Sequence, residues 1–168
     1  MTIIEATIDD IHLLEPLVNQ AYRGGEAAGG WTNEAHLISG PRTSAFDLGE
    51  CFRDGVILKG VNDSGEIMGC VYLEQRGDTL YLGMLSVWPR EQGAGIGKQF
   101  LAFAAARALA LGCKAIRISV ISVRSELIAW YERHGYVRTG EMEPFHAGER
   151  FGSMKVPLEL VVLEKPVD

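Results

Sequence analysis

The segment from Gln92 to Lys98 has the composition of an anion-binding loop, because it contains three glycines and ends in a lysine. It follows an apolar run that ends at Val87 and precedes a helix expected from Phe100. At such a junction the backbone N–H groups have no partner within the helix, and the helix dipole is positive. Glycines have no Cβ to keep a phosphate oxygen away from these amides. The loop therefore predicts a phosphate-binding site, to which Lys98 adds a positive charge.

The spacing of the glycines excludes two common phosphate-binding loops. A P-loop needs glycine at the position of Gln92 and a hydroxyl residue at the position of Gln99. A dinucleotide-binding loop that starts at either of the first two glycines needs its third glycine at Lys98 or Phe100. The chain therefore holds its anion in another arrangement.

The apolar pattern around the loop predicts the elements that must position it. Two turn sequences, residues 62–65 and 76–78, separate three runs that are expected to form an antiparallel meander: Val56–Val61, Ile67–Glu74 and Leu80–Val87. A strongly apolar buried helix, Phe100–Leu111, follows the loop and leads to the strand Ala115–Val120. Strand, helix and strand in this order imply a parallel, right-handed crossover.

Further elements are expected on both sides of this centre. Before it we expect a strand over Ile3–Ile8, an amphipathic helix over Ile11–Tyr22, and a Gly-rich rim over Gly24–Gly40 with a short helical signal at Thr32–Ile38. After it we expect a helix over Arg124–His134, stopped by Gly135, and the strands Tyr136–Gly140 and Leu158–Leu163.

Length, composition and charge narrow the classes of function. The 168 residues, 47% hydrophobic and 23% charged, are typical of one globular domain, which we expect to span residues 1–168. Sixteen basic against 22 acidic residues give a net charge of −6, which does not favour nucleic acid as a partner. The run Phe100–Leu111 is shorter than the roughly 20 residues that span a membrane. The N-terminus lacks the pattern of a signal peptide, so a cytoplasmic protein without membrane partners is expected.

The cysteines do not indicate a disulfide framework or a metal site. Cys51, Cys70 and Cys113 are odd in number, and no two of them form a CxxC pair. We therefore expect ordinary half-buried thiols and no bound metal.

One known family combines these features. The pattern Gln92-x-x-Gly95-x-Gly97, preceded by the strand Leu85-x-Val87-x-Pro89, resembles the coenzyme A-binding motif of the GCN5-related N-acetyltransferases, the GNAT superfamily. The closing segment, Trp130-Tyr131-x-x-x-Gly135-Tyr136, and the order of the elements are also similar to that family.

The resemblance implies an α/β GNAT fold, with a mixed, mostly antiparallel sheet of six to seven strands flanked by about four helices. It implies an acyltransferase that uses acetyl-CoA as co-substrate, without a metal, and transfers the acetyl group to the primary amine of a small molecule by direct attack in a ternary complex. Two alternatives stay open: acetylation of a protein or peptide, and a non-catalytic domain that binds coenzyme A as a sensor.

The resemblance also assigns roles to residues. The strand amides of Leu85, Ser86 and Val87 are expected to pair with the pantetheine arm, and Tyr131 to protonate the departing thiolate. Arg124 stands where many members carry a cofactor-contacting asparagine, and it suits a phosphate, an acceptor carboxylate or a helix cap. The pyrophosphate is expected on the loop residues Gln92, Gly93, Ala94, Gly95, Ile96, Gly97 and Lys98.

Acceptor recognition is expected from residues 22–42 and 142–156, where Trp31, Arg42 and Phe145 stand out. Glu74, at the end of the expected strand Ile67–Glu74, is a further candidate. Both signs of charge are present, so a carboxylate-bearing acceptor and a polyamine are both compatible with the sequence. The remaining candidates for acceptor contact are His146, Glu149 and Arg150, and those for the general base are Glu26, Glu34, Glu74 or a chain of waters.

The sequence also suggests how copies of the chain associate. Last strands are often shared between subunits in this family, and Leu158–Leu163 is an apolar strand near a terminus. A homodimer is therefore expected.

Overall fold

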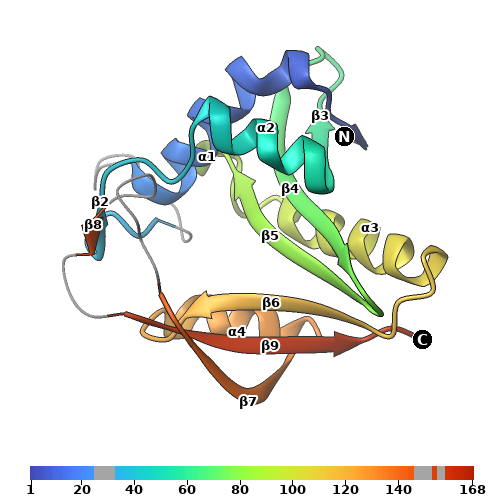
Figure 1. The fold of residues 1–168 in the computed structure, drawn as a ribbon. Helices are drawn as coiled ribbons and strands as arrows, with labels where there is room; N and C mark the ends of the chain where they lie inside the picture. Colours follow the sequence, from blue (N-terminus) through green and yellow to red (C-terminus); the bar gives the residue numbers. More distant parts are fainter. Residues whose placement is uncertain (25–32, 146–152, 155–157) are drawn as a thin grey trace.

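The computed structural model describes residues 1–24, 33–145, 153–154 and 158–168, and places a seven-stranded sheet at the centre of the chain, with the order β1-β3-β4-β5-β6-β9-β7 (Figure 1). All neighbouring strands are antiparallel except β5 and β6. The strands of this sheet are β1 (Thr2–Glu5), β3 (Val56–Val61), β4 (Ile67–Arg76), β5 (Thr79–Val87), β6 (Ala115–Ile121), β7 (Val137–Pro144) and β9 (Glu159–Pro166). The α-helices are α1 (Ile11–Arg23), α2 (Ala45–Asp54), α3 (Ile96–Ala110) and α4 (Ser125–Arg133). The expected mixed sheet, its meander and its parallel crossover are confirmed.

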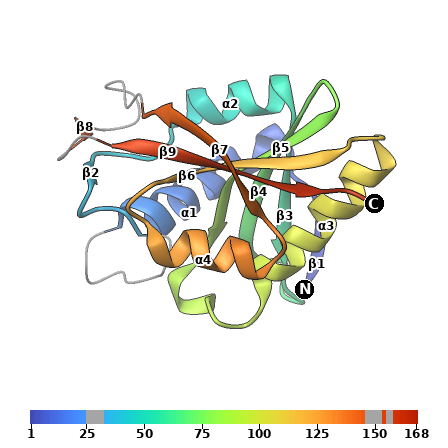
Figure 2. The same ribbon diagram turned by 90° about the horizontal axis from the view of Figure 1, so that it is seen from below.

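The two faces of the sheet carry separate apolar clusters. On β4, Cys70 and Tyr72 face one cluster, which includes Leu14, Leu17 and Val18 of α1. The alternate residues Val71 and Leu73 face the other cluster, which includes the buried residues of α3 and α4. Figure 2 shows α2 on one side of the sheet and α3 and α4 on the other. This period of two explains why β4 is apolar almost throughout its length.

Two glycines seat α3 against the sheet. Gly60 on β3 and Gly69 on β4 lie opposite each other in the strand register. A Cβ added to either residue would lie 3.1 Å from an atom of the Phe100 ring. Phe100 is fully buried, so its ring occupies the space that these glycines leave. The contact fixes the helix whose N-terminus follows the glycine loop.

The prediction of a wholly buried helix after the loop is wrong in part. The helix begins at Ile96, not at Phe100, and only one face of it is buried. Phe103, Leu109 and Leu111 are 47%, 58% and 41% exposed. Apolar residues on all sides of a helix do not show which side faces the sheet, and the tertiary packing decides it.

Two differences from the sequence analysis lie in the first third of the chain. The described part of the helical signal at Thr32–Ile38 forms a turn over 35–37 and then β2 (Ile38–Ser39), which pairs with β8 (Ser153–Met154). The helix α2 was not predicted, although Ser44 caps it by accepting a hydrogen bond from the Asp47 N–H at 3.2 Å. The first strand also ends at Glu5, because Ile8 already begins the 3-10 turn η1 (Ile8–Asp10).

The last strand of the chain lies inside the sheet. β9 pairs with β6 on one side and with β7 on the other, and both β7 and β9 are longer than predicted. Val161, Val162 and Leu163 are buried within the chain. Their apolar character is therefore explained without a second subunit, and the homodimer stays a prediction.

The parallel pair at the centre of the sheet separates soon after it forms. Only Thr79–Tyr81 of β5 pair with Ala115–Arg117 of β6, and the two strands then diverge (Figure 1). Farther along β5, two residues stand opposite Val71 of β4, and one of them, Met84, has a positive φ of 57°. This is a β-bulge, and such bulges bend a strand and redirect its groups. The sheet therefore opens into a wedge beside the bulge.

The thiols and the helices give two further observations. Cys51, Cys70 and Cys113 are all free, and Cys70 and Cys113 are buried. In the described part of the chain, no helix has both the length and the apolar character that crossing a bilayer requires.

We expect Phe100→Ala to lower the free energy of unfolding by about 3–5 kcal/mol, because it leaves a cavity over the two glycines. Phe103→Ala removes the same side chain from an exposed position of the same helix and should cost less than about 1 kcal/mol. Urea unfolding of both variants measures the difference. Equal losses would contradict the placement of Phe100.

Candidate active site

The glycine loop closes onto the end of β5. After the 3-10 turn η3 (Pro89–Glu91), the Gln92 side-chain amide donates a hydrogen bond to the Val87 carbonyl at 3.1 Å. Gly93 and Gly95 have positive φ angles of 92° and 76°, a conformation that side chains with a Cβ rarely adopt. Gly95 caps the N-terminus of α3. The glycines therefore have two roles: they adopt a backbone conformation that other residues disfavour, and, as the sequence indicated, they let a phosphate come close to the backbone amides.

A groove of about 640 Å³ lies over this loop. The loop lines it with Gln92, Gly93, Gly95, Ile96, Gly97 and Lys98, and Val87 of β5 lies beside them. From α4 come Trp130, Arg133 and the carboxylate Glu126. The amide groups of the first turn of a helix, two cationic side chains and the absence of a Cβ at the glycines suit a phosphate ester. The residues that line this groove thus fit the pyrophosphate of coenzyme A.

A second cavity, of about 250 Å³, lies in the wedge between the diverging strands. β5 contributes Tyr81–Met84 and β6 contributes Ile118–Ile121. Leu127 and Tyr131, one turn apart on α4, also line it. The bulge and the tyrosine that the sequence singled out therefore belong to one cavity.

Tyr131 is held by aromatic neighbours. The Trp130 and Tyr136 rings meet the Tyr131 ring edge to face, with centroid distances of 5.0 and 5.4 Å. Burial raises the pKa of Tyr131 well above its usual value, and the nearby Tyr22 raises it further. The phenol therefore keeps its proton at neutral pH. Within the described residues, its hydroxyl forms no hydrogen bond and is available to a ligand in the cavity.

A buried ion cluster joins α1 and α4 through Glu34 at the wall of the cavity. The Glu34 carboxylate accepts a hydrogen bond from Arg23 Nε at 2.8 Å and lies 3.6 Å from Arg124 Nη1. Arg23 is the last residue of α1, and Arg124 is the N-cap of α4. All three side chains are at most 9% exposed. The cluster fixes both helices beside the wedge.

The residues that the sequence singled out lie in different parts of the structure. Arg42, Phe145 and Arg124 line the cavity of Tyr131, and Arg124 does not line the groove over the glycine loop. Glu74 lies in a neighbouring pocket and pairs with Arg76 at 2.7 Å. Leu85 and Ser86 are buried and line neither the groove nor the cavity, and Ala94 is exposed on the loop. Outside the described residues lie Glu26, Trp31, His146, Glu149 and Arg150.

Sequence reasoning missed several residues of the cavity. Tyr22 lies at the start of the region 22–42 expected to contact the acceptor but was not singled out there, and its hydroxyl donates to the Leu85 carbonyl at 2.8 Å. Arg23 follows it and carried no motif. Met84 gave no signal either, because its role depends on the bulge. Among the described residues, no group of three or more His, Cys, Asp or Glu side chains is arranged to hold a metal ion.

The comparison with known proteins now adds to this geometry. The family model described as "Acetyltransferase (GNAT) family" matches residues 26–136. The chain belongs to the GNAT family of acetyltransferases. No sequence among the curated proteins matches this GNAT chain significantly.

Solved structures share the GNAT fold at low sequence identity. The ribosomal-protein-S18-alanine N-acetyltransferase of Escherichia coli is 14% identical, with a TM-score of 0.75 over 99% of this chain and 94% of that one. The IAA acetyltransferase of Bacillus cereus is 16% identical, with a TM-score of 0.70 over 98% of each chain. A spermidine N-acetyltransferase chimera derived in part from Vibrio cholerae is 15% identical, with a TM-score of 0.69 over 98% of this chain and 94% of that one. The names of these proteins give different acceptors, so the fold does not decide the acceptor.

We expect Gly95→Asp to weaken the binding of coenzyme A by about 10- to 100-fold, because it places a negative charge where the phosphates are expected. Gly65→Asp is a matched control, since Gly65 also has a positive φ (81°) and open space around its Cβ position but lies in the β3–β4 turn. Isothermal titration calorimetry with coenzyme A measures both. Unchanged affinity in Gly95→Asp would remove the loop from the coenzyme A site.

Proposed function

We propose that this protein is an acetyl-CoA-dependent N-acetyltransferase that transfers the acetyl group to the primary amine of a small molecule, by direct attack in a ternary complex. One observation carries the proposal: β5 and α4 each line both the groove and the cavity. Val87 and Trp130 belong to the groove, and Met84 and Tyr131 to the cavity. A ligand held at the glycine loop and extended along β5 would reach Tyr131.

The open edge of β5 supports such a path. Beyond Tyr81, the strand no longer pairs with β6. The Leu85 and Val87 carbonyls already accept hydrogen bonds from Tyr22 and Gln92, so it is the N–H groups on that side that a ligand would use. The amides of Leu85, Ser86 and Val87 would pair with the pantetheine arm as an added strand does. The bulge at Met84 redirects the backbone at the inner end of this path, where an N–H group would stabilise the oxyanion that develops on the thioester carbonyl.

Tyr131 is suited to act as the general acid. Bound acetyl-CoA supplies the thioester, and transfer of its acetyl group leaves a thiolate whose conjugate acid has a pKa near 8.5 if it resembles an ordinary thiol. The raised pKa of Tyr131 keeps the phenol protonated until that charge forms. The Tyr131 hydroxyl then donates its proton to the sulfur, and the proton that the amine releases to water returns to the phenolate, which restores the phenol.

The described part of the cavity supplies no free carboxylate base. Glu34 is its one described carboxylate, and guanidinium groups lie within 3.6 Å of both its oxygens. Glu74 lies in the next pocket and is paired with Arg76. We therefore assign Glu34 a positioning role, and removal of the amine proton to water.

The volume of the cavity supports a small acceptor. About 250 Å³ is below the usual 300–1,000 Å³ of drug-sized ligand sites, so it suits a molecule of amino-acid size. Release of free thiol from acetyl-CoA, measured with amines, amino acids, polyamines and peptides, tests the reaction and the acceptor class together. Turnover only with peptides would favour a protein substrate. Binding of acetyl-CoA without turnover on any acceptor would favour a sensor.

We expect Tyr131→Phe to lower kcat by about 100-fold or more while the KM for acetyl-CoA stays the same, because it removes only the proton donor. Tyr136→Phe is the control. The Tyr136 hydroxyl is buried without a hydrogen-bond partner among the described residues, so its removal should leave kcat unchanged. If Tyr131→Phe kept full turnover, another group would have to protonate the thiolate.

A further inference from the structure

We infer that Arg42 selects an acceptor that carries an anionic group, namely a small primary amine with a carboxylate, such as an α-amino acid. This inference rests on the proposed function and deepens it. It follows from the charge in the cavity beside Tyr131 and from the way in which Arg42 is held there.

The described lining of the cavity has an excess of positive charge. It contains three guanidinium groups, those of Arg23, Arg42 and Arg124, and a single carboxylate, that of Glu34. Glu34 lies between Arg23 and Arg124, and Arg42 forms no ion pair with any described residue. Partial burial of a cation without a counterion costs free energy, which an anionic ligand would offset.

Arg42 is fixed before any ligand arrives. Asn19 of α1 accepts hydrogen bonds from the backbone N–H groups of Arg42 and Thr43, at 2.7 and 2.9 Å, and donates to the Thr43 carbonyl at 3.1 Å. The Arg42 guanidinium lies over the Tyr22 ring, 5.3 Å from its centroid. The hydroxyl of that ring donates to the Leu85 carbonyl on β5. Arg42 is therefore held relative to the strand that is expected to position the thioester, and this arrangement lowers the entropy cost of binding.

The position of Arg42 assigns its anion to the acceptor. Arg42 lines the cavity of Tyr131 and does not line the groove over the glycine loop, where the phosphates of coenzyme A fit. A guanidinium presents parallel N–H groups that match the two oxygens of a carboxylate. An amino acid is also of a size that the cavity admits.

A neighbouring pocket favours the opposite charge. It shares Arg42, Tyr81, Gly83 and Met84 with the cavity. Its described lining includes four carboxylates: Asp47, Glu50, Asp54 and Glu74. Asp54 and Glu74 are each paired with an arginine, at 2.9 and 2.7 Å. This pocket would suit a distal cationic group, so polyamines form the opposing arm of the test.

The experiment compares acceptors that carry a carboxylate with acceptors that lack it. Initial rates of thiol release from acetyl-CoA are measured with a panel of L-amino acids, the matching L-amino acid amides, and polyamines. For the acid that is accepted best, we expect kcat/KM to exceed that of its amide by about 10- to 100-fold. Arg42→Gln should remove this preference by raising KM for the acid, with kcat and the rates for the amide little changed.

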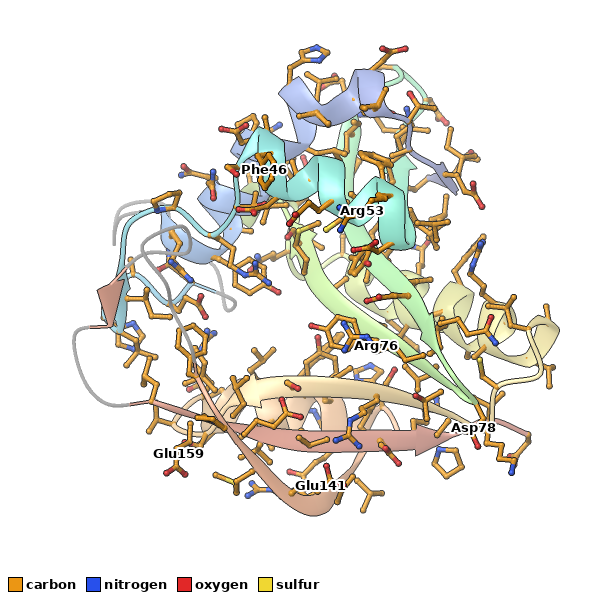
Figure 3. All side chains as sticks on the ribbon, in the orientation of Figure 1. Phe46, Arg53, Arg76, Asp78, Glu141 and Glu159 are labelled. Carbon is orange, nitrogen blue, oxygen red and sulfur yellow. The ribbon has the colours of Figure 1, made fainter. Side chains whose placement is uncertain are left out.

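Arg53→Gln provides a matched control. It makes the same substitution on α2 (Figure 3). The Arg53 side chain is 67% exposed, and its replacement should leave kcat/KM for both acceptors unchanged. Thermal unfolding of each variant, compared with that of the unmodified protein, tests whether the variant is folded.

Two outcomes separate this inference from the proposed function. If amides or polyamines are acetylated as well as the acids, or if Arg42→Gln slows acids and amides equally, the inference is overturned and the proposed function stands. If no member of the panel releases thiol although calorimetry shows that coenzyme A binds, the proposed function fails and the inference fails with it.

Discussion

The separation of β5 from β6 is the constraint on which the rest of the structure depends. Two parallel strands that paired along their whole length would close the sheet and leave no space beside Tyr131. Here the pairing ends at Tyr81, and the bulge at Met84 turns the strand away. A bulge with a positive φ at a non-glycine residue costs conformational energy, and such strain persists where the surrounding packing fixes it. The wedge is thus built into the sheet.

Two sets of contacts maintain the wedge at its two ends. At the loop end, Phe100 packs over Gly60 and Gly69, so α3 presents its N-terminus beside the last residues of β5. At the other end, Glu34 joins the end of α1 to the start of α4. Hydrophobic packing positions the glycine loop, and a buried ion cluster positions the wall of the cavity. Removal of one partner from such a cluster leaves a charge buried without compensation, which is why its members act together.

The local features of the site could be predicted from the sequence, and its long-range contacts could not. The glycine loop and the meander follow from short patterns, because turn chemistry and helix starts depend on neighbouring residues, whereas Tyr131 was singled out by the resemblance to the GNAT family. Arg124 illustrates the limit: its type was compatible with a phosphate, a carboxylate or a cap, and only the fold places it against Glu34, 90 residues earlier in the chain. The helix α2 was missed although its capping residue Ser44 is present, because a polar cap before a mixed sequence is a weak signal.

By itself, the sequence determined the family, the mixed sheet and the loop that fits a phosphate, because these depend on residue type and local spacing. The tertiary structure decided which charged side chains share a cavity. The sequence does not distinguish Arg42 from Glu74 as a residue of the site. In the structure, the divergence of the strands and the Asn19 contacts place Arg42 in the cavity of Tyr131. Glu74 stays outside that cavity and is paired with Arg76. An anion-binding loop made of backbone amides can be recognised in the sequence, whereas a binding cavity made of distant side chains exists only once the chain has folded.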